Sequence, residues 1–159
     1  MKCSNLAIPV IRDATVEDVV AICAIYNYYV LRAGDLVTFE EAEVAVEEMQ
    51  RRYETITQKL QFPFLVACLD ERVVGYAYGN VFKERSAYRY SAENTVYLHA
   101  DYQRRGVGTA LMSALMPRLA ARGIKQVVAV LGTKQDNPGS YRLHDMFGFK
   151  QVALYPKIG

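Results

Sequence analysis

The sequence predicts a mixed α/β fold, in which a β-sheet with both parallel and antiparallel strands is covered by helices on both faces. Its 159 residues are 52% hydrophobic and 23% charged, the balance of a globular protein with its own core. The predicted elements follow the order β-α-α-β-β-β-α-β-α-β, without repeats or a long linker. A β-α-β crossover in the second half requires two parallel strands. We therefore expect one domain over residues 1–159.

The first part of the chain is expected to form a strand and a helix. Residues 7–12 are the strand. The helix covers residues 15–31, because Thr15 and Asp18 form an approximate capping box at its start and Gly34 follows its end.

A second helix and a hairpin are expected next. Residues 40–59 are predicted to be helical because apolar residues recur at three- and four-residue steps, namely at Ala42, Val46, Met49, Tyr53 and Ile56. Residues 62–69 and 72–82 read as two strands joined by a tight Asp-Glu turn. The polar and aromatic residues 83–94 are expected to form a loop.

The remaining elements form the crossover. Strands are expected at residues 95–100 and 126–131, with a helix over residues 107–121 between them and a short helix over residues 140–146 after them. Pro117 lies inside the longer helix, where it removes a backbone donor and is expected to cause a kink.

The charge and the apolar runs exclude several classes of protein. Nineteen basic and 17 acidic residues leave a net charge of +2, too small to indicate a nucleic acid or an anionic membrane as partner. The longest apolar run, 19–26, is far shorter than the roughly 20 residues of a membrane helix. No apolar secretory signal is visible at the N-terminus, so a cytoplasmic location is expected.

The cysteines do not indicate a metal site. Cys3, Cys23 and Cys68 fit neither a zinc site nor a redox pair, so no metal is predicted and the thiols are expected to be reduced and buried. The alternative is a nucleophilic cysteine, which needs a nearby base. The histidines available for that role are His99 and His144.

The most informative segment, 95–108, passes from a strand through a basic, glycine-rich loop into a helix. Such a loop directs backbone N–H groups into a concavity at the positive end of a helix dipole, which suits a pyrophosphate. Gly106 and Gly108 leave room for phosphate oxygens, and Arg104 and Arg105 can add charge-assisted contacts. The spacing fits neither a Walker loop nor a dinucleotide fingerprint. An ordinary helix start with turn glycines remains the alternative.

Several motifs carry a resemblance to one family. The run Gln103-Arg104-Arg105-Gly106-Val107-Gly108 resembles the acetyl-CoA pyrophosphate loop of the GNAT superfamily of N-acetyltransferases. Residues 82–97 resemble the corresponding segment of phosphinothricin and methionine sulfoximine acetyltransferases. The resemblance extends over residues 8–155 and includes three further motifs: Ile11-Arg12-x-Ala14-x-x-x-Asp18, Val37-Thr38-Phe39-Glu40, and Val127 to Leu131 followed by Asn137-x-x-Ser140-x-x-Leu143-His144-x-x-x-Gly148-Phe149.

The resemblance implies a splayed sheet, with acetyl-CoA as cosubstrate and its pantetheine arm between two parallel strands that part. Here these are the strands at residues 95–100 and 126–131. Backbone groups of Tyr97, Leu98 and Ala100 are expected to pair with the pantetheine amides, and one N–H is expected to polarise the thioester carbonyl. The other expected cofactor-binding residues are Gln103, Arg104, Arg105, Gly106, Val107, Gly108, Asn137 and Ser140, the last of which is also expected to cap the short helix.

The implied reaction is direct attack of an amine on the thioester, which needs no protein nucleophile. Glu93 is the expected base, because it matches a glutamate of the family's active site, and a raised pKa or a water relay is expected. The alternative is an exposed loop carboxylate. His144 matches a position where many relatives have a tyrosine that protonates the departing thiol, a task within reach of imidazole. A packing histidine is the alternative, and His99 is expected to be structural or exposed.

The implied acceptor is a small amino acid or its analogue. Tyr88 and Arg89 match positions near the amino acid substrate, and an arginine suits a bidentate grip on a carboxylate. Phe39 matches a residue that lines this pocket. Weaker candidates are Lys83, Arg85 and Tyr90. The alternatives are acetylation of a protein N-terminus or another amine, and a non-catalytic acyl-CoA-binding domain.

The C-terminal part departs from the family pattern. Relatives usually continue past the Gly-Phe turn through two antiparallel strands, whereas here only residues 151–155 read as a strand. We therefore expect one strand of the sheet to be missing, with an unpaired apolar edge at residues 127–130. Either a second copy of the chain covers this edge in a homodimer, or residues 151–155 shift inward to fill the gap.

Overall fold

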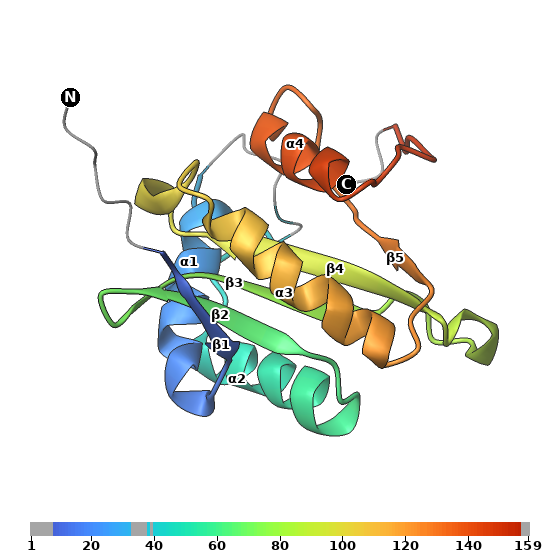
Figure 1. Cartoon of the computed structure of the whole chain (residues 1–159). Helices are drawn as coiled ribbons and strands as arrows, with labels where there is room; N and C mark the ends of the chain where they lie inside the picture. Colours follow the sequence, from blue (N-terminus) through green and yellow to red (C-terminus); the bar gives the residue numbers. More distant parts are fainter. Residues whose placement is uncertain (1–7, 33–37, 39, 157–159) are drawn as a thin grey trace.

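The computed structural model describes residues 8–32, 38 and 40–156, and the architecture is shown in Figure 1. Its strands are β1 (Val10–Asp13), β2 (Phe64–Leu69), β3 (Arg72–Val81), β4 (Ser91–Leu98) and β5 (Gln126–Val128). Its α-helices are α1 (Val19–Val30), α2 (Val46–Glu54), α3 (Val107–Ala121) and α4 (Pro138–Met146). Short 3₁₀ turns lie at Val16–Asp18, Ser86–Tyr88 and Ala100–Tyr102, and a π-helical turn at Thr55–Lys59 extends α2.

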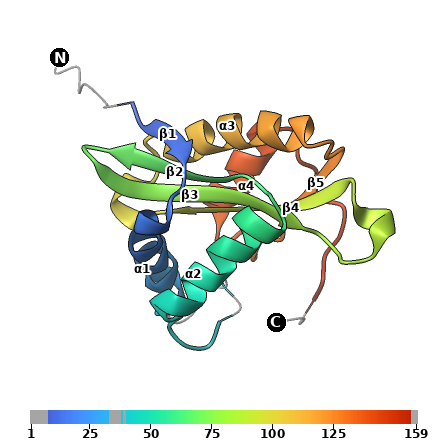
Figure 2. The same cartoon turned by 90° about the horizontal axis from the view of Figure 1, so that it is seen from below.

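The five strands form one mixed sheet in the order β1-β2-β3-β4-β5. Neighbours are antiparallel except β4 and β5, which are parallel. Figure 2 shows α1 and α2 on one face of the sheet and α3 on the other. The predicted mixed sheet with helices on both faces is therefore confirmed.

The core lies on both sides of the central strands. Residues 64–67 of β2 are almost completely buried, because each face of this strand carries a helical layer. Ile22 of α1 covers one face, and Leu111 and Leu115 of α3 cover the other. The helix α3 thus rests on the sheet over most of its length.

The start of the first helix follows its capping box. The Asp18 carboxylate accepts a hydrogen bond from the Thr15 backbone N–H at 2.8 Å and from the Thr15 hydroxyl at 3.2 Å. A 3₁₀ turn at Val16–Asp18 precedes α1, and the strand before it runs from Val10 to Asp13. The predicted helix stop, Gly34, lies outside the described residues.

The second helix is shorter than predicted. It begins at Val46, whereas the apolar spacing predicted helix from residue 40. The reason is the side chain of Asn27, whose amide accepts from the Val44 N–H and donates to the Val44 carbonyl, both at 2.9 Å. These bonds occupy the backbone groups that a helix would use.

The start of β4 corrects the predicted loop. Residues 91–94 belong to this strand, although the sequence assigned them to the loop over residues 83–94. Ala92 and Glu93 lie between two partners, since β3 pairs with them on one side and β5 on the other, whereas Ser91 pairs with β5. The strand also ends earlier than predicted, at Leu98 instead of residue 100.

Pro117 does not interrupt α3. The helix runs continuously from Val107 to Ala121. Pro117 and Ser113, whose carbonyl loses its usual donor, both lie on the exposed side of the helix. Water can therefore donate a hydrogen bond to the Ser113 carbonyl, which explains why the helix continues past Pro117.

The end of the chain differs most from expectation. The strand β5 stops at Val128 instead of residue 131, and the predicted strand at residues 151–155 is not formed. Val152, Leu154 and Tyr155 are 91%, 77% and 67% exposed. Val152 and Leu154 alternate as the residues of a strand would. The segment pairs with no strand among the described residues, so it stays irregular.

Candidate functional site

The loop before α3 has the geometry of an anion site. Gly106 adopts φ +79°, a left-handed conformation that favours glycine, and an added Cβ would meet no atom within 4 Å. The first helical hydrogen bond runs from the Ala110 N–H to the Gly106 carbonyl. The N–H groups of residues 107–109 are therefore outside the helical ladder at the positive end of the helix dipole, where they can bind an anion.

The side chains of this loop are exposed and partly anchored. Arg104 and Arg105 are exposed, and the Arg105 guanidinium lies 5.1 Å from the ring centre of Tyr102. The Gln103 amide donates to the Tyr29 hydroxyl at 2.8 Å, and this hydroxyl donates to the Leu98 carbonyl at 2.5 Å. Tyr29, which the sequence reasoning missed, thus joins α1 to the loop and to the end of β4.

Gly108 also has a packing role that the sequence did not predict. It is buried, and a Cβ at this position would lie 3.1 Å from Leu143 of α4. Its missing side chain therefore lets α3 and α4 pack closely, while its N–H remains at the helix start.

The sheet opens beyond Glu93. Pairing between β4 and β5 ends at Glu93 and Val128, whereas β4 continues to Leu98. From residue 94 onwards, the edge of β4 that faces β5 has no strand partner among the described residues. This is the splayed geometry that the resemblance implied.

The backbone groups directed into this opening differ from those predicted. The His99 N–H donates to the Val74 carbonyl at 2.8 Å, which makes residues 74 and 99 a hydrogen-bonded pair of the antiparallel ladder. Such pairs alternate along the strand, so Tyr97 directs its backbone groups to β3. Val96 and Leu98 direct theirs towards the opening.

Two backbone predictions therefore need correction. Tyr97 cannot offer its N–H to a ligand in the opening, because β3 uses it. Ala100 lies in a 3₁₀ turn, where its carbonyl accepts from the Gln103 N–H at 3.4 Å. Leu98 keeps its predicted place at the opening through its N–H, because its carbonyl accepts from the Tyr29 hydroxyl. Val96 was missed because its orientation depends on which residues of β4 form the hydrogen-bonded pairs with β3.

Glu93 is a half-buried strand residue at the point where the sheet opens. Burial raises the pKa of its carboxyl group, in the direction expected for a base. It lies on the same face as Tyr78 and Thr95. Burial is the main reason why the pKa of Tyr78 is raised, and the charge of Glu93 adds to this effect. The alternative of an exposed loop carboxylate is therefore wrong.

The face of the sheet that carries Glu93 is aromatic. Ring centres of Phe64 and Tyr78 are 4.7 Å apart, and those of Tyr26 and Tyr97 are 5.3 Å apart. A small cavity of about 40 Å³ lies between this face and the helices; its lining is Tyr26, Met49, Arg52, Ile56, Phe64, Tyr76 and Tyr78. The Arg52 guanidinium is held by Glu40 at 2.8 Å and Glu48 at 2.9 Å.

His144 belongs to α4 and packs against the opposite face of β4, where it is only 5% exposed. Its Nε2 atom is 3.0 Å from the Asn94 side-chain nitrogen, and its Nδ1 atom is 2.8 Å from the Ser140 carbonyl oxygen. Desolvation lowers the pKa of the imidazole. Asn94 was missed by the sequence reasoning, because the polar residues 83–94 were assigned to a loop.

The cap of α4 is the reverse of the prediction. Asn137 caps this helix, because its side-chain oxygen accepts the Ser140 N–H at 3.2 Å. Ser140, predicted as the cap, instead offers its carbonyl to His144. The side-chain oxygen of Asn137 is thus already engaged within the protein.

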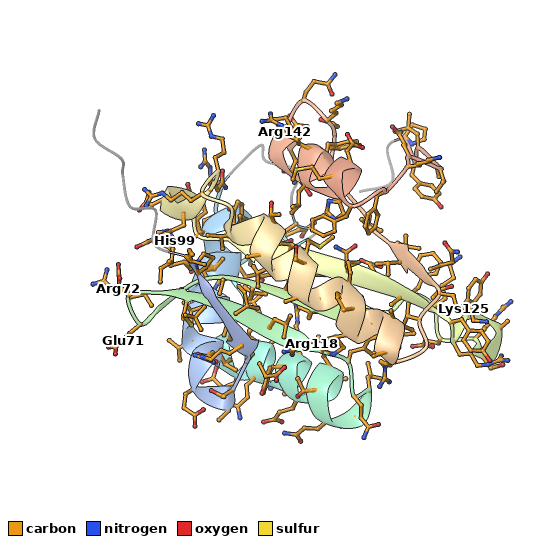
Figure 3. The ribbon with its side chains drawn as sticks, viewed as in Figure 1. Glu71, Arg72, His99, Arg118, Lys125 and Arg142 are labelled. Atoms are coloured by element: carbon orange, nitrogen blue, oxygen red, sulfur yellow. The ribbon has the colours of Figure 1, made fainter. Side chains whose placement is uncertain are left out.

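Tyr88 and Arg89 lie in an exposed loop between β3 and β4. The Arg89 guanidinium is 4.4 Å from the ring centre of Tyr90 and donates to the Ser86 carbonyl at 3.1 Å. The Lys125 ammonium is 4.9 Å from the same ring. Figure 3 shows Lys125 at one end of the sheet and the exposed His99, which precedes the loop before α3, at the other end. This basic loop is therefore remote from the anion site. Phe39 lies outside the described residues.

The other weaker candidates share the exposure of this loop. Lys83 and Arg85 are exposed, and the Lys83 ammonium is 5.3 Å from the ring centre of Tyr88. Among the described residues, no recorded contact joins either of these side chains to Glu93.

The cysteine and membrane expectations can also be checked. Cys23 is buried and donates to the Val44 carbonyl at 3.2 Å, whereas Cys68 is only partly buried and Cys3 lies outside the described residues. Within the described ranges, no cluster of three or more His, Cys, Asp or Glu side chains suits a metal ion. No helix in the same part of the chain is long and apolar enough to span a membrane.

Comparison with known proteins identifies the relatives of this arrangement. Residues 18–149 match the model of the acetyltransferase (GNAT) family. A phosphinothricin N-acetyltransferase of Streptomyces viridochromogenes is 36% identical over 139 residues, which are 87% of this chain and 73% of the relative. An L-methionine sulfoximine/L-methionine sulfone acetyltransferase of Salmonella typhimurium is 34% identical over 149 residues, covering 94% of this chain and 84% of the relative.

A solved structure shows the same fold. The crystal structure of a GNAT superfamily phosphinothricin acetyltransferase from Sinorhizobium meliloti, in complex with acetyl-CoA, superposes with a TM-score of 0.84. The two sequences are 36% identical, and the similarity covers 91% of this chain and 76% of the other. The likeness thus includes both the sequence motifs and the three-dimensional arrangement of strands and helices.

Proposed function

This chain belongs to the GNAT family of acetyltransferases, and on that premise we propose that it transfers the acetyl group of acetyl-CoA to the amine of a small amino acid or amino acid analogue. Phosphinothricin and methionine sulfoximine are the acceptors that the similar enzymes suggest. The observation that carries the proposal is Glu93, a half-buried carboxylate at the point where β4 and β5 part.

The loop before α3 is proposed to hold the pyrophosphate of acetyl-CoA. The N–H groups of residues 107–109 offer donors at the positive helix end, and Gly106 leaves the approach open. Arg104 and Arg105 add positive charge without needing to be buried. Gln103 keeps the loop in place through Tyr29.

The opening between the strands is proposed to hold the pantetheine arm. The backbone N–H groups of Val96 and Leu98 face this opening, where they can pair with the arm as a neighbouring strand would. One of them would also polarise the thioester carbonyl, which makes its carbon more electrophilic. Asn137 and Ser140 are proposed to contact the arm from α4.

Glu93 is proposed to accept the proton of the acceptor ammonium. An amine can attack only after it has lost this proton, and a carboxylate with a raised pKa is a stronger base than an ordinary one. Partial burial of Glu93, on the face of the sheet that also carries Tyr78, removes water that would otherwise stabilise its charge. The amine then attacks the thioester directly.

His144 is proposed to return a proton to the departing thiolate. It lies on the other face of β4, so the two proton transfers occur on opposite sides of the strand. Arg89 is proposed to bind the carboxylate of the acceptor, with Tyr88 beside it, because a guanidinium can bind both oxygens at once. Phe39 is proposed to line the same pocket.

A thiol-release assay tests the function. Purified protein with acetyl-CoA should release CoA thiol in the presence of methionine sulfoximine, methionine sulfone or phosphinothricin. Peptides with free N-termini and amines without a carboxylate serve as comparison acceptors. Thiol release with peptides alone would replace the proposed acceptor, and binding of acetyl-CoA without turnover on any amine would reject the enzymatic function.

We also propose that the whole chain is one catalytic domain that acts as a homodimer in the cytoplasm, without nucleic acid. The net charge of +2 and the exposed apolar residues Val130, Val152 and Leu154 support this proposal. Light scattering coupled to size exclusion should give twice the monomer mass. A monomer at micromolar concentration would contradict the dimer.

A further inference from the structure

Asn94 and His144 form a buried polar pair between β4 and α4. Each is only 5% exposed, and the Asn94 amide nitrogen is 3.0 Å from His144 Nε2. An amide nitrogen only donates, so Nε2 accepts; the Ser140 carbonyl, 2.8 Å from Nδ1, only accepts, so Nδ1 carries the hydrogen. These contacts hold His144 as the neutral ring protonated on Nδ1.

The other end of the Asn94 amide is unsatisfied. Its Oδ1 atom is buried and has no hydrogen-bond partner in the part of the chain that the structure describes. Buried acceptors of this kind are rare in folded proteins. The contact of the amide nitrogen with Met112 sulfur, at 3.6 Å, does not compensate for this oxygen.

A rotation of the Asn94 side-chain amide by half a turn would give this oxygen a hydrogen-bond partner. It would bring Oδ1 to Nε2, where it could accept a hydrogen bond from an Nε2–H. Since Nδ1 already carries a hydrogen for Ser140, a ring with both hydrogens is the imidazolium cation. The present orientation of Asn94 thus fits the neutral ring, and the rotated one fits the charged ring.

We propose that Asn94 is a positioning residue whose amide has two working orientations, one for neutral and one for protonated His144. This inference rests on the proposed role of His144 in acetyl transfer. The acceptor ammonium loses two protons when it becomes an amide, of which Glu93 takes one. The other also leaves on the Glu93 side of β4, to water. Protonated His144 gives its Nε2 proton to the sulfur, so that the Nε2–H bond breaks as the S–H bond forms, and the neutral ring takes a proton from water before the next turnover.

Asn94 is the polar side chain at Nε2 of the ring, whereas the carbonyl and the hydroxyl of Ser140 lie at Nδ1, at 2.8 and 3.4 Å. Burial lowers the pKa of His144, while the hydrogen bond with the Ser140 carbonyl and, to a smaller extent, the charge of Asp145 on α4 raise it. From the segment after α4, Phe149 contacts the ring edge-on at 4.9 Å, and it does not titrate. Glu93 points to the other face of β4.

The wild-type protein gives the first test. The chain has two histidines, and the exposed His99 is an internal reference for His144. Nitrogen chemical shifts of the imidazole rings at neutral pH should show His144 protonated on Nδ1 only. A ring protonated on Nε2 only would overturn the proposal.

Two substitutions give the second test. Asn94→Asp places a carboxylate at Nε2 and should raise the midpoint of His144 by about one pH unit or more, whereas Asn94→Leu removes the polar partner and should lower it. Ser113→Asp adds the same charge to the exposed side of α3 and should leave the midpoint unchanged. Equal titration midpoints of His144 in wild type, Asn94→Asp and Asn94→Leu would overturn the proposal. If one of the two variants does not fold, Asn94→Ser replaces it.

Kinetics connect the pair to the reaction. The pH profile of kcat in Asn94→Asp should shift in the same direction as the His144 midpoint, while the affinity for acetyl-CoA stays close to that of wild type. A moved midpoint with an unmoved kcat profile would overturn the role of Asn94 in the reaction. Because the titration needs no substrate, failure of the proposed function, seen as no thiol release with any amine, remains distinguishable from failure of this inference.

Discussion

The hydroxyl group of Tyr29 accepts a hydrogen bond from the side chain of Gln103 at 2.8 Å, across 74 positions of the chain. The same hydroxyl donates to the Leu98 carbonyl at 2.5 Å. The helix α1 therefore holds the loop that is proposed to bind pyrophosphate and the end of the strand that is proposed to bind pantetheine. Both parts of the cosubstrate site share one anchor.

Removing this anchor should weaken acetyl-CoA binding. Tyr29→Phe keeps the ring but loses both hydrogen bonds, each worth about 1 kcal/mol, so we expect a several-fold higher Kd by calorimetric titration. The neighbouring Tyr28→Phe is the control, because the Tyr28 hydroxyl accepts from the exposed Arg32 at 2.5 Å instead. Equal affinities for the two variants would contradict the anchoring role.

Bulk at Gly106 should block the anion site. Gly106→Ala is expected to raise the Kd for acetyl-CoA about tenfold or more, equivalent to ~1.4 kcal/mol. Its backbone strain is matched by Gly123→Ala at the other end of α3, since Gly123 has φ +87° and an added Cβ there also meets no atom within 4 Å. Both variants should lose similar thermal stability, but only Gly106→Ala should lose affinity. A Kd unchanged in Gly106→Ala would reject the pyrophosphate site.

Glu93→Gln should affect the reaction far more than binding. It removes the proton acceptor but keeps the shape of the side chain, so kcat should fall by about 10²–10⁴ while the Kd for acetyl-CoA changes little. The exposed Glu84→Gln is a charge-matched control. In wild type, kcat should decline as pH falls through the raised pKa of Glu93, and this acidic limb should be absent from the variant. A loss of kcat below about threefold would count against Glu93 as the base.

Arg89→Ala should change which acceptors are used well. If Arg89 binds the carboxylate, KM should rise for amino acids and their analogues and stay constant for amines without a carboxylate. Arg89→Lys keeps the charge but not the planar fork, and it should recover only part of the loss. Arg85→Ala, in the same exposed loop, is the control. Parallel losses for both classes of amine would reject the carboxylate grip.

The pair of Arg12 and Asp18 should contribute to stability above acidic pH. The guanidinium donates to the carboxylate at 2.6 and 2.7 Å, and these bonds lower the pKa of Asp18 in the folded state. Asp18→Asn should therefore lower the free energy of unfolding by about 2 kcal/mol at neutral pH. A group with a lowered folded pKa loses its contribution as pH falls through that pKa, so wild type and variant should converge in acid. Chemical unfolding at several pH values checks this, and a constant difference would contradict it.

The sequence predicted those parts of the fold whose causes are local. The capping box of Thr15 and Asp18 needs only three positions of chain, and the hairpin of β2 and β3 needs only a short turn. The glycine-rich loop and α3 were predicted equally well, because the turn at Gly106 directly precedes the start of the helix.

The errors arose where a distant residue decides the local structure. Helix α2 begins late because Asn27, 17 positions away, binds the backbone of Val44. Residues 91–93 are strand because β5, more than 30 positions later in the chain, pairs with them. Asn94 could not be paired with His144 from the sequence, since 50 positions separate them and their contact depends on how α4 packs.

The alternation of side chains along β4 makes this strand a partition. Glu93 and the aromatic residues Tyr26, Phe64 and Tyr78 belong to one compartment, and Asn94, Met112 and His144 belong to the other. Substitutions that reshape the first compartment for a larger or differently charged acceptor leave the second one untouched. The proposed acceptor range and the proposed thiolate protonation can therefore diverge independently, which gives protein engineers a surface to diversify without disturbing the rest of the proposed catalytic site.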